Sequence, residues 1–535
     1  MRVTPALTMV RMRILVCLAA VMAVWGQSST YDVLLRHGRV YDGTGAPWYV
    51  ADIGIRGDTI AAIGHLDGAT GKVTIDLRGL AVSPGYVDTH SHARGGLFES
   101  PAAENCVRQG VTTVIEGPDG GSAIPLKPFL NDVGSRRIGI NFGTLAGHGS
   151  IRGAVMGTEN RKARPDELDR MRALARQAMQ DGAFGMSTGL FYVPGNYAPT
   201  EEVIELAKVV GALGGVYTSH MRDEAAQVLD SVRETIRIGE EGGLPTQVTH
   251  HKIIGGPNWG KSKETLRLIA EARERGVDAT IDQYPYTASS TGIAALLPQW
   301  SQAGGRKALL ERMAAPETRA RIKAVIVDKI KFDRGAGDPK NVQIASCGFD
   351  RSLAGKTLAD LAKERGQVPT PENAAEIAMG LIEKGSCSAV YHAISEEDVE
   401  RILRSPYTMV ASDGGIPKFG DGVPHPRNYG TFARVLGRYV RERKAITLEE
   451  AIYKMSGFPA ARFGLMDRGL LRPGMKADIA VFDPDKVRDK AEFGNPHQYA
   501  EGFTHVLVNG QFELRDAKMT GTLAGHVLYG PAHTK

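Results

Sequence analysis

Four histidines and one aspartate stand at the ends of apolar runs along this 535-residue chain. They are His90 and His92 in VDTHSH, His220 in YTSH, His250 in VTHHK and Asp413 in VASD. In an extended strand, residues i and i+2 face the same side, so the side chains of His90 and His92 can point together. Imidazole nitrogens and carboxylate oxygens form a ligand set that suits zinc. The pattern therefore predicts a site for one or two zinc ions.

The elements that must position these residues are short apolar runs that alternate with helical stretches. Eight candidate strands cover residues 81–92, 111–117, 138–148, 182–189, 214–220, 246–252, 278–286 and 407–415. Alternating strands and helices are typical of a parallel α/β sheet, and eight such units predict a TIM (β/α)8 barrel. The chemistry of such a barrel lies at the C-terminal ends of its strands, which is where the histidines and the aspartate stand.

Both ends of the chain have a sequence pattern that differs from that of the barrel region: short apolar runs are closely spaced between Gly and Asp residues. This pattern covers residues 31–82 and returns over residues 466–530, which predicts one small β-sandwich domain built from both chain ends. The barrel domain would then cover residues 83–465. The long interval between its last two strands predicts an insertion over about residues 300–385.

The first 26 residues have the parts of a secretory signal peptide. Arg11 and Arg13 precede an apolar run over residues 14–24, and small and polar residues follow it. The run is about half the length that a bilayer-spanning helix needs, so we expect no membrane span once residues 1–26 are removed. The protein is thus expected to be exported, to the periplasm or outside the cell.

The net charge and the number of cysteines exclude some classes of binding partner and of fold. The formal net charge is +5, and removal of the three arginines of residues 1–26 leaves +2, so there is no electrostatic case for binding nucleic acid or an anionic membrane. Four cysteines exclude a disulfide scaffold. Cys17 would leave with the leader, and Cys106, Cys347 and Cys387 are expected to be core thiols. The expected partner is a small-molecule substrate.

The strings around the candidate ligands resemble a known superfamily. PGYVDTHSH, followed in order by TSH, VTHHK and ASDG, is similar to strings of the amidohydrolase superfamily. The fuller strings GMSTGLFYVPGNYAPTEE, YTSHMRDE, DQYPYTAS and SGFPAARFGL resemble the N-acyl-D-amino-acid deacylase (D-aminoacylase) family, over about residues 31–530. The resemblance implies a TIM barrel with a small β domain. It also implies zinc-dependent hydrolysis of an N-acyl-D-amino acid to a D-amino acid and a carboxylate.

The resemblance implies roles for the five residues at the strand ends. His90, His92, His220, His250 and Asp413 match the family's metal and catalytic positions. Asp413 would also be the general base, which takes a proton from the attacking water and passes it to the leaving amine. Because zinc lowers the pKa of its water to about 7 and polarises the scissile carbonyl, a nearby carboxylate can carry out these proton transfers.

The position that bridges two metals departs from the family pattern. The fourth candidate strand, residues 182–189, contains no lysine, which argues against the carbamylated lysine of many hydantoinase-like relatives. D-aminoacylases usually have a cysteine in a GNCG string after the second strand, and this chain has GPDG there, with Asp119 in the cysteine's place. We favour Asp119 as the bridging ligand. Glu116 is the competing bridge, and the alternative for Asp119 is a tight-turn residue without a ligand role.

The expected substrate contacts lie beside the metal ligands. Lys252 follows His250 by two residues and faces the same side of the strand, so its cation can hold a carboxylate near the metal. By resemblance, Lys252 and Tyr284 contact the substrate α-carboxylate, and Ser290 is a further candidate. His148 is a candidate for polarising the carbonyl, or for orienting a loop.

Three further expectations concern the surroundings of the pocket. Arg222 and Glu224 are expected to form an ion pair that supports a ligand loop, and His425 and Arg427 are expected to border the pocket. Deacylases that prefer acidic D-amino acids have an arginine shortly after YPY, and residues 287–298 of this chain contain none. This difference predicts a preference for neutral or hydrophobic side chains.

Two other functions are compatible with the pattern. One is a dipeptidase or a cyclic-amide hydrolase, of the dihydroorotase or hydantoinase type, within the same superfamily. The other is an exported metal- or ligand-binding protein with an inactive barrel. Asp413 argues against the second function, because a binding protein needs no base beside the metal.

Overall fold

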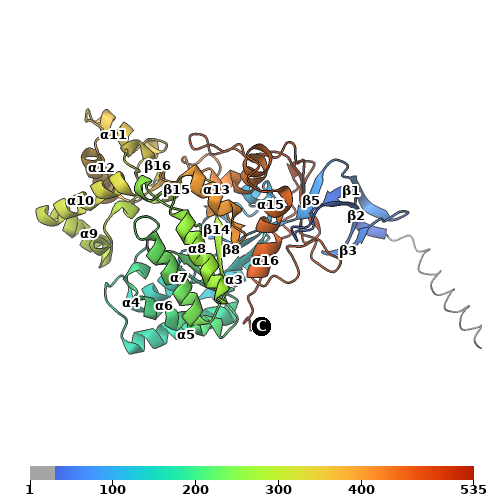
Figure 1. Ribbon diagram of the computed structural model, residues 1–535, viewed down its shortest axis with the longest axis horizontal. Coiled ribbons are helices and arrows are strands. Elements are labelled where there is room, and N and C mark those ends of the chain that lie inside the picture. Colours follow the sequence, from blue (N-terminus) through green and yellow to red (C-terminus); the bar gives the residue numbers. More distant parts are fainter. Residues whose placement is uncertain (1–29, 535) are drawn as a thin grey trace, which may run out of the picture.

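The computed structural model describes residues 30–534 of the chain. The barrel occupies the middle of the molecule, with a sheet domain on one side and the insertion on the opposite side (Figure 1). The predicted signal peptide, residues 1–26, lies outside the described residues. Within residues 30–534, no helix is long and apolar enough to cross a membrane.

Eight parallel strands close into a barrel. They are β6 (Tyr86–Asp88), β8 (Val111–Glu116), β9 (Asn141–Thr144), β11 (Gly185–Gly189), β12 (Val216–His220), β13 (Thr246–Val248), β14 (Ala279–Gln283) and β18 (Thr408–Val410). Three short strands extend them: β7 (Ser91–His92) after β6, β10 (Ala146–Gly147) after β9, and β19 (Gly414–Gly415) after β18. The hydrogen-bonded order runs β6–β8–β9, continues as β10–β11–β12–β13–β14–β18 and returns through β19–β7. The predicted TIM barrel is confirmed.

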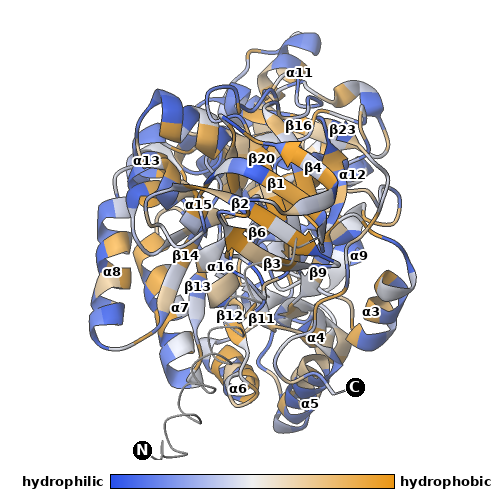
Figure 2. Ribbon diagram, turned by 90° about the vertical axis from the view of Figure 1, so that its right-hand side faces the viewer, coloured by the Kyte–Doolittle hydropathy of each residue, from blue (hydrophilic) through white to orange (hydrophobic). Residues whose placement is uncertain are grey.

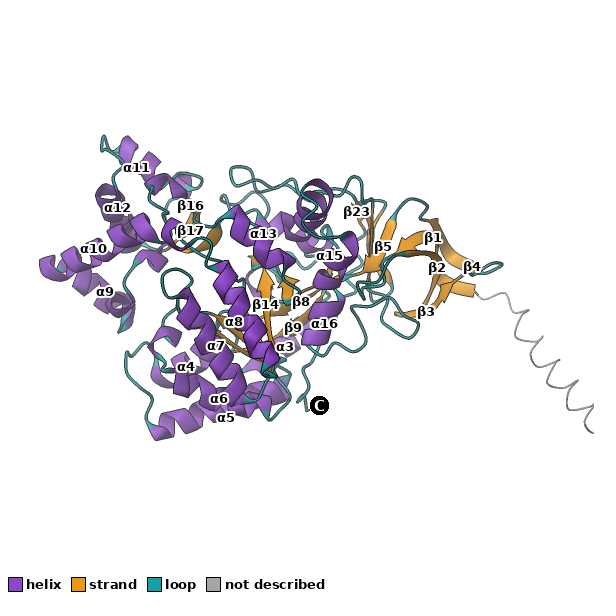
Figure 3. Cartoon of the chain, viewed as in Figure 1, coloured by secondary structure: helices purple, strands orange, loops and turns teal. Residues whose placement is uncertain are grey.

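The barrel strands are buried on both faces, which explains their composition. Every residue of β8, which reads VTTVIE, is buried between the barrel interior and the surrounding helices. β-Branched residues fit such a pleated, two-sided surface. The helices cover the outside of the barrel (Figure 3): α3 (Leu126–Ser135), α4 (His148–Met156), α5 (Pro165–Asp181), α6 (Thr200–Gly211), α7 (Val228–Gly242), α8 (Ser262–Glu274), α13 (Glu396–Arg404), α15 (Leu448–Met455) and α16 (Gly457–Arg462).

Helix α6 shows how these helices dock. It reads TEEVIELAKVVG, and its buried residues Val203, Leu206 and Val210 recur at helical spacing along one face. Glu201 lies in its first turn, near the positive end of the helix dipole, and Lys208 lies in its last turn, near the negative end, so both charges stabilise the helix. A helix with one apolar face can pack that face against the barrel strands while its polar face remains in solvent.

The two ends of the chain join in one nine-stranded sheet. Its strands are β1 (Thr30–Val40), β2 (Tyr49–Arg56), β3 (Thr59–Gly64), β4 (Thr70–Asp76), β5 (Ala81–Pro84), β20 (Ile479–Phe482), β21 (Phe503–Val508), β22 (Gln511–Arg515) and β23 (Lys518–Met519). Antiparallel pairing of β5 with β20 links the two ends. Apolar residues such as Leu35, Ile53 and Val481 form its core, and Figure 2 shows the hydrophobic strands. The predicted β domain from both ends is confirmed, with all strands in one hydrogen-bonded sheet.

The first predicted barrel strand, residues 81–92, is divided between the two domains. Strand β5 ends at Pro84 in the sheet domain, and the barrel strand β6 begins at Tyr86. A Cβ atom on Gly85, between them, would lie 2.3 Å from the side chain of Thr112. Proline removes a backbone donor and glycine permits this close approach, so the chain changes sheets at this point.

The insertion is a small α/β unit between β14 and β18. Its strands β15 (Ser289–Gly292), β16 (Val342–Cys347) and β17 (Cys387–Tyr391) form an antiparallel sheet with β17 in the centre. Its helices are α9 (Gly305–Ala314), α10 (Pro316–Phe332), α11 (Leu358–Glu364) and α12 (Pro371–Lys384). Ile322, Ile326 and Ile330 of α10 belong to a core separate from that of the barrel. The unit extends beyond the predicted range of 300–385, because its first and last strands lie outside that range.

Two of the three cysteines in the described residues form a disulfide. Cys347 ends β16 and Cys387 begins β17, directly opposite each other in the sheet, and their sulfurs are bonded. The expectation that both are core thiols is wrong. Strand pairing brings together two cysteines that are 40 positions apart, and the spacing alone does not reveal it. Cys106 is a buried free thiol, as predicted.

Candidate metal centre and substrate pocket

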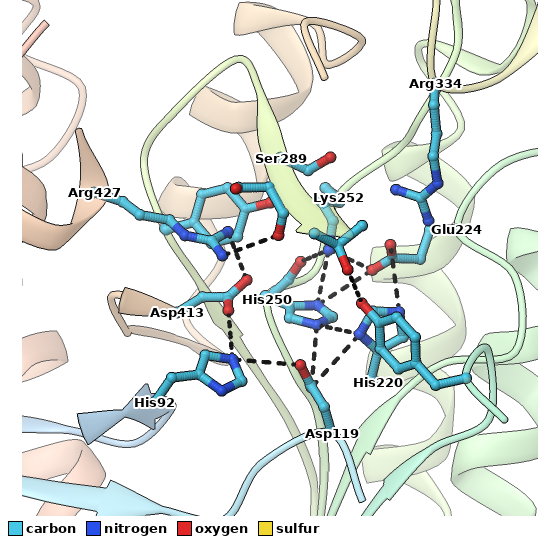
Figure 4. Close-up of a pocket in the computed structure, with 14 residues that line it drawn as sticks. His92, Asp119, His220, Glu224, His250, Lys252, Ser289, Arg334, Asp413 and Arg427 are labelled. Atoms are coloured by element: carbon cyan, nitrogen blue, oxygen red, sulfur yellow. Dashed lines mark hydrogen bonds and ion pairs between the residues drawn. The ribbon is translucent and has the colours of Figure 1, made fainter. Parts of the chain in front are cut away.

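The predicted ligands converge at the C-terminal end of the barrel, as Figure 4 shows for most of them. His90 and His92 follow β6, His220 ends β12, His250 follows β13 and Asp413 follows β18. Asp119, from the loop after β8, joins them. The structure therefore brings together all six residues that the sequence assigns to the metal site.

The six residues form two overlapping groups that share Asp119. One group contains His90, His92 and Asp413, and the other contains His220 and His250. Oδ1 of Asp119 lies 3.4 Å from Nε2 of His90, 3.4 Å from Nε2 of His250 and 3.5 Å from Nδ1 of His220. Its Oδ2 lies 3.5 Å from Nε2 of His92. A carboxylate between two sets of imidazoles has the placement of a ligand that bridges two ions.

The donor atoms of this cluster fit a bound cation. Oδ1 of Asp119 and Nε2 of His90 are buried without a hydrogen-bond partner among the described residues. Buried polar atoms normally have a partner, so atoms that converge without one point to a ligand between them. Nδ1 of His220 and Nε2 of His250 also converge, to 2.7 Å. The nitrogen and carboxylate donors together are those that zinc prefers.

Three of the ligands have an unusual backbone conformation. The φ angles are +56° for Asp119, +36° for His250 and +49° for Asp413, a region that residues other than glycine seldom adopt. Hydrogen bonds hold this geometry: the Asp413 amide donates to the carbonyl of His90 at 2.9 Å, and the His250 amide donates to Oδ1 of Asp282 at 2.5 Å. Strain of this kind persists where the surroundings require it, and here it aims three side chains at the centre.

Two buried aspartates that the sequence analysis did not single out support the ligand loops. Asp88 accepts hydrogen bonds from the amides of His90 and Ser412, and from the Ser412 hydroxyl. Burial raises the pKa of Asp88 to about 6. Asp282 accepts from the His250 amide and from Gln247. Both lie within strings that the sequence analysis uses, VDTHSH and DQYPY, so their closeness in sequence to the metal ligands could have indicated a supporting role.

Glu116, the competing bridge, lies outside the metal cluster. Its Oε1 is 3.3 Å from Nε of Arg94, and its Oε2 accepts a hydrogen bond from the Thr144 hydroxyl at 3.1 Å. Asp119 does occupy a tight turn, closed by a hydrogen bond from Gly121 to Pro118. The turn and the ligand interpretations are therefore compatible, because the turn directs the carboxylate toward the imidazoles.

Asp413 lies where the metal cluster meets the pocket. Its Oδ1 is 3.1 Å from Nε2 of His92, and its Oδ2 accepts a hydrogen bond from Nη1 of Arg427 at 2.7 Å. Burial opposes ionisation of Asp413, but the charges of Arg427 and His90 and the contact with His92 outweigh it, so its pKa lies below its ordinary value. Asp413 is therefore an ionised carboxylate with a fixed orientation.

A cavity of about 300 Å³ opens beside Asp413 and Asp119. It combines metal-site residues with side chains from barrel loops and from the insertion. Its lining residues are His92, Asp119, Tyr192, His220, Glu224, His250, Lys252, Tyr284, Ser289, Ser290, Thr291, Arg334, Asp413 and Arg427. The predicted substrate residues Lys252, Tyr284 and Ser290 are among them.

Lys252 is held in a buried ion pair with Glu224. Its Nζ also lies 2.8 Å from Nδ1 of His250 and donates to the His250 carbonyl at 2.9 Å. Burial opposes the charge of Glu224, but Lys252 and the neighbouring histidines outweigh it, so the pKa of Glu224 lies well below its usual range. The predicted Arg222–Glu224 pair is wrong, because the Arg222 side chain instead binds Glu234 at 2.8 Å.

Tyr284 and Arg427 form one side of the cavity. The Tyr284 hydroxyl is buried without a partner among the described residues, and the Arg427 guanidinium carbon lies 4.8 Å from the Tyr284 ring centroid. Nη2 of Arg427 donates to the carbonyl of Ser290 at 3.2 Å. His425, expected beside it, does not line the cavity; it contacts the carbonyl of Ala288 at 3.0 Å.

His148 is not at the cavity. It is fully buried at the start of α4, and its Nε2 lies 3.1 Å from Oε1 of Glu202. Nη1 of Arg152 donates to the other oxygen of Glu202 at 2.5 Å. The substrate role proposed for His148 is therefore corrected to a structural one, because Glu202 of α6 holds its ring inside the barrel wall.

The insertion contributes Arg334, which the sequence analysis missed. This residue follows α10 and lines the cavity opposite Arg427 (Figure 4). It stands far along the chain from the YPY string, in a stretch without a recognised motif. No sequence signal points to it.

Comparisons with known proteins agree with this arrangement. The sequence profile described as "Amidohydrolase family" matches residues 355–512. The chain is 38% identical to the D-aminoacylase of Alcaligenes xylosoxydans xylosoxydans, over 94% of this chain and 98% of that protein. A solved D-aminoacylase structure, from work on its binuclear metal center, superposes with a TM-score of 0.80 at 36% identity, over 93% of this chain and all of that one.

A second solved structure contains a metal. The N-acyl-D-glutamate deacylase of Bordetella bronchiseptica, complexed with zinc and a phosphonate inhibitor, has a TM-score of 0.80 at 34% identity and covers 94% of this chain. Similarity at this level extends over nearly the whole length of both chains. This protein therefore belongs to the D-aminoacylase family of the amidohydrolase superfamily.

Proposed function

We propose that this protein hydrolyses the amide bond of N-acyl-D-amino acids and releases a D-amino acid and a carboxylate. The observation that carries this proposal is the cluster in which Asp119 lies between four imidazoles, with Asp413 facing a cavity of about 300 Å³. The similarity to D-aminoacylase supports the same substrate class.

The residues that would hold one or two zinc ions are those of the cluster: His90, His92, Asp119, His220, His250 and Asp413. Bound zinc supplies a nucleophile by lowering the pKa of water to about 7, and it acts as a Lewis acid toward the scissile carbonyl. Asp119, which faces both groups of imidazoles, is the proposed bridge. The contacts of Glu116 with Arg94 and Thr144 support Asp119 rather than Glu116 in this role.

Asp413 is the proposed general base and acid. As an ionised carboxylate it can accept the proton of the attacking water and deliver it to the leaving nitrogen. Arg427 holds one of its oxygens at 2.7 Å, which leaves the other directed toward the metal cluster. The carboxylate thereby has a fixed orientation, with one oxygen held by Arg427 and the other directed at the metal cluster, for proton transfer from the attacking water to the leaving nitrogen.

The substrate α-carboxylate is proposed to lie on the side lined by Lys252, Tyr284, Ser290 and Arg427. Within residues 30–534 the Tyr284 hydroxyl has no hydrogen-bond partner, so it can donate a hydrogen bond to the substrate. Lys252 is paired with Glu224 and Arg427 with Asp413, so the two cations hold the α-carboxylate together with the Tyr284 hydroxyl rather than as free charges. This placement keeps the scissile amide beside Asp413.

We also propose that the protein is exported, with residues 1–26 as its signal peptide. The disulfide between Cys347 and Cys387 supports this, because disulfides persist chiefly in oxidising compartments. Cell fractionation and N-terminal sequencing of the mature protein test the proposal. A cytosolic protein that retains residues 1–26 would contradict it.

A panel of N-acetyl-D- and N-acetyl-L-amino acids, assayed with and without a chelator, tests the activity. We expect hydrolysis of the D-series alone, lost on chelation and restored by zinc. Asp413→Asn should lower kcat by about 100- to 10,000-fold, the contribution typical of general acid–base catalysis. Its zinc content should stay that of the wild type, because His90, His92 and Asp119 remain.

Asp421→Asn is the matched control, since Asp421 lies on the loop after β18 and is half exposed. It should leave kcat unchanged. Cleavage of L-dipeptides alone would contradict the proposed substrate class. Full activity of Asp413→Asn would contradict the proposed role of that carboxylate.

A further inference from the structure

Three cations of lysine or arginine line the cavity, and two of them have a carboxylate partner. Lys252 is paired with Glu224, and Arg427 is paired with Asp413 at 2.7 Å. Arg334 forms no ion pair and no hydrogen bond with any residue in the described part of the chain, although it is only 3% exposed. Arginine is seldom buried without a partner, because removal of its charge from water is costly.

The Arg334 guanidinium lies between two aromatic rings. Its central carbon is 4.6 Å from the ring centroid of Phe191, on the loop after β11, and 5.5 Å from that of Tyr391, at the end of β17. Asp333 and Glu224 are the acids whose charges act on it most, and neither forms an ion pair with it. Glu224 is already engaged by Lys252. Among the described residues, no carboxylate is in ion-pair contact with the Arg334 guanidinium, which lines the cavity.

The turn that carries Arg334 is held in place by backbone hydrogen bonds. The amide of Gly335 donates to the carbonyl of Lys329 at 3.3 Å, and the amide of Gly337 donates to the carbonyl of Ile330 at 3.0 Å. The side-chain amide of Asn341 donates to the carbonyl of Gly335 at 2.9 Å. The guanidinium is thus positioned before any ligand arrives, which lowers the entropic cost of binding one.

Two arginines on opposite sides of one cavity suit a ligand with two anionic groups. Figure 4 shows Arg427 on the Asp413 side and Arg334 on the insertion side, above Glu224. The planar guanidinium fork matches the geometry of a carboxylate and binds it through two parallel hydrogen bonds. With the α-carboxylate on the Arg427 side, Arg334 is the lining cation that is left for a second carboxylate of the same substrate.

We propose that Arg334 is a specificity-determining residue that binds a second carboxylate of the substrate. Preferred substrates are then N-acyl-D-amino acids with an acidic group besides the α-carboxylate, either on the amino-acid side chain or at the end of the acyl group. This inference rests on the proposed deacylase activity. It differs from the sequence-based expectation of neutral side chains, which relied on the absence of an arginine near YPY and did not consider one from the insertion.

The test compares pairs of substrates that differ only in the second carboxylate. N-acetyl-D-glutamate and N-acetyl-D-glutamine probe the side chain, and N-succinyl-D-leucine and N-butyryl-D-leucine probe the acyl group. The wild-type enzyme should favour the acidic member of one pair by about 10- to 100-fold in kcat/KM, the range for a charged hydrogen bond. The pair that shows the preference identifies the position of the carboxylate.

Arg334→Met should remove this preference by lowering kcat/KM for the acidic substrate, with less than about threefold change for its neutral partner. Arg334→Lys keeps the charge without the fork and should retain part of the preference, which guards against a misfolded methionine variant. Arg351→Met is the control, because Arg351 belongs to the insertion but its side chain is 88% exposed. It should leave both pairs unchanged.

A wild-type enzyme that hydrolyses both members of both pairs equally would overturn the inference about Arg334. So would an Arg334→Met enzyme, folded by its melting temperature, that loses the same factor on acidic and neutral substrates, since Arg334 would then bind the α-carboxylate. Failure to hydrolyse any N-acyl-D-amino acid would instead overturn the proposed function itself. The two failures are therefore distinguishable.

Discussion

The two sides of the pocket are built in different ways. On the metal side, every candidate ligand lies at the end of a barrel strand or in the loop that directly follows it, so the order of the motifs in the sequence is the order of the ligands around the rim. On the insertion side, Arg334 comes from the end of α10, and the rings around it come from a barrel loop and from β17. The positions of the metal-site residues follow from the barrel strands, whereas the proposed contact of Arg334 with substrate depends on how the insertion packs against a barrel loop.

The largest expected effect comes from breaking the metal side at its centre. Asp119→Ala removes the carboxylate that both groups of imidazoles share. Metal content should fall, and kcat should fall by more than about 100-fold, because even outer partners of metal ligands contribute 10- to 100-fold. Metal analysis and steady-state kinetics on the same preparation measure both effects.

Two further variants sharpen this result. Asp119→Cys places a thiolate at the position, a softer zinc ligand, and should restore much of the metal content. Glu116→Gln changes the acid that Arg94 and Thr144 engage and should leave the metal content unchanged. Equal loss of metal in Glu116→Gln and Asp119→Ala would contradict the assignment of Asp119, rather than Glu116, as the shared metal ligand.

The metal side could be predicted from the sequence because a closed barrel places all its strand ends on one rim. His90 and His92 share a strand face, and the strings that carry His220, His250 and Asp413 each follow an apolar run. Asp119 was predicted from its place in a GPDG turn, and the structure brings it to the ligands. These inferences need only local strand patterns and the closure of the sheet.

The insertion side could not be predicted in this way. Arg334 reaches the cavity only because α10 ends against the loop after β13, a contact between segments far apart in the chain. The partner of Glu224 depends on side-chain directions, which favour Lys252 over the nearby Arg222. The pairing of Cys347 with Cys387 likewise follows from the register of β16 and β17. Each of these features arises from tertiary packing rather than from spacing.

A smaller effect, on stability, is expected from breaking the Glu224–Lys252 ion pair, which lies between the metal side and the insertion side of the pocket. Glu224 and Lys252 form a buried pair beneath Arg334, so Glu224→Gln or Lys252→Met leaves the other buried charge without its ion-pair partner. Each variant should lower the free energy of unfolding by about 3–5 kcal/mol, as measured by urea denaturation. The double variant should lose less than the sum, because it leaves no unpaired charge. Additive losses would contradict a direct pair.

A smaller effect is expected from weakening the insertion alone. Cys347→Ser with Cys387→Ser opens a link that closes a loop of 40 positions, and should cost about 2–4 kcal/mol. Because the insertion has its own core, metal content should remain that of the wild type. Hydrogen exchange should increase in β16 and β17 and not in the barrel strands. Increased exchange throughout the barrel would show that the two units do not unfold separately.

The smallest change tests the contact that joins the two sides. Gly255 has φ +87°, and a Cβ on it would lie 2.3 Å from the carbonyl oxygen of Phe332, the last residue of α10. Gly255→Ala should therefore cost about 1–3 kcal/mol in stability and displace the turn that carries Arg334.

Gly256→Ala is the matched control, since no atom lies within 4 Å of its added Cβ and its φ is not positive. We expect Gly255→Ala to reduce the preference for a second carboxylate while metal content stays constant, and Gly256→Ala to change neither. Equal effects of the two alanines on the substrate preference would show that the position of Arg334 does not depend on this contact, because only Gly255 touches α10.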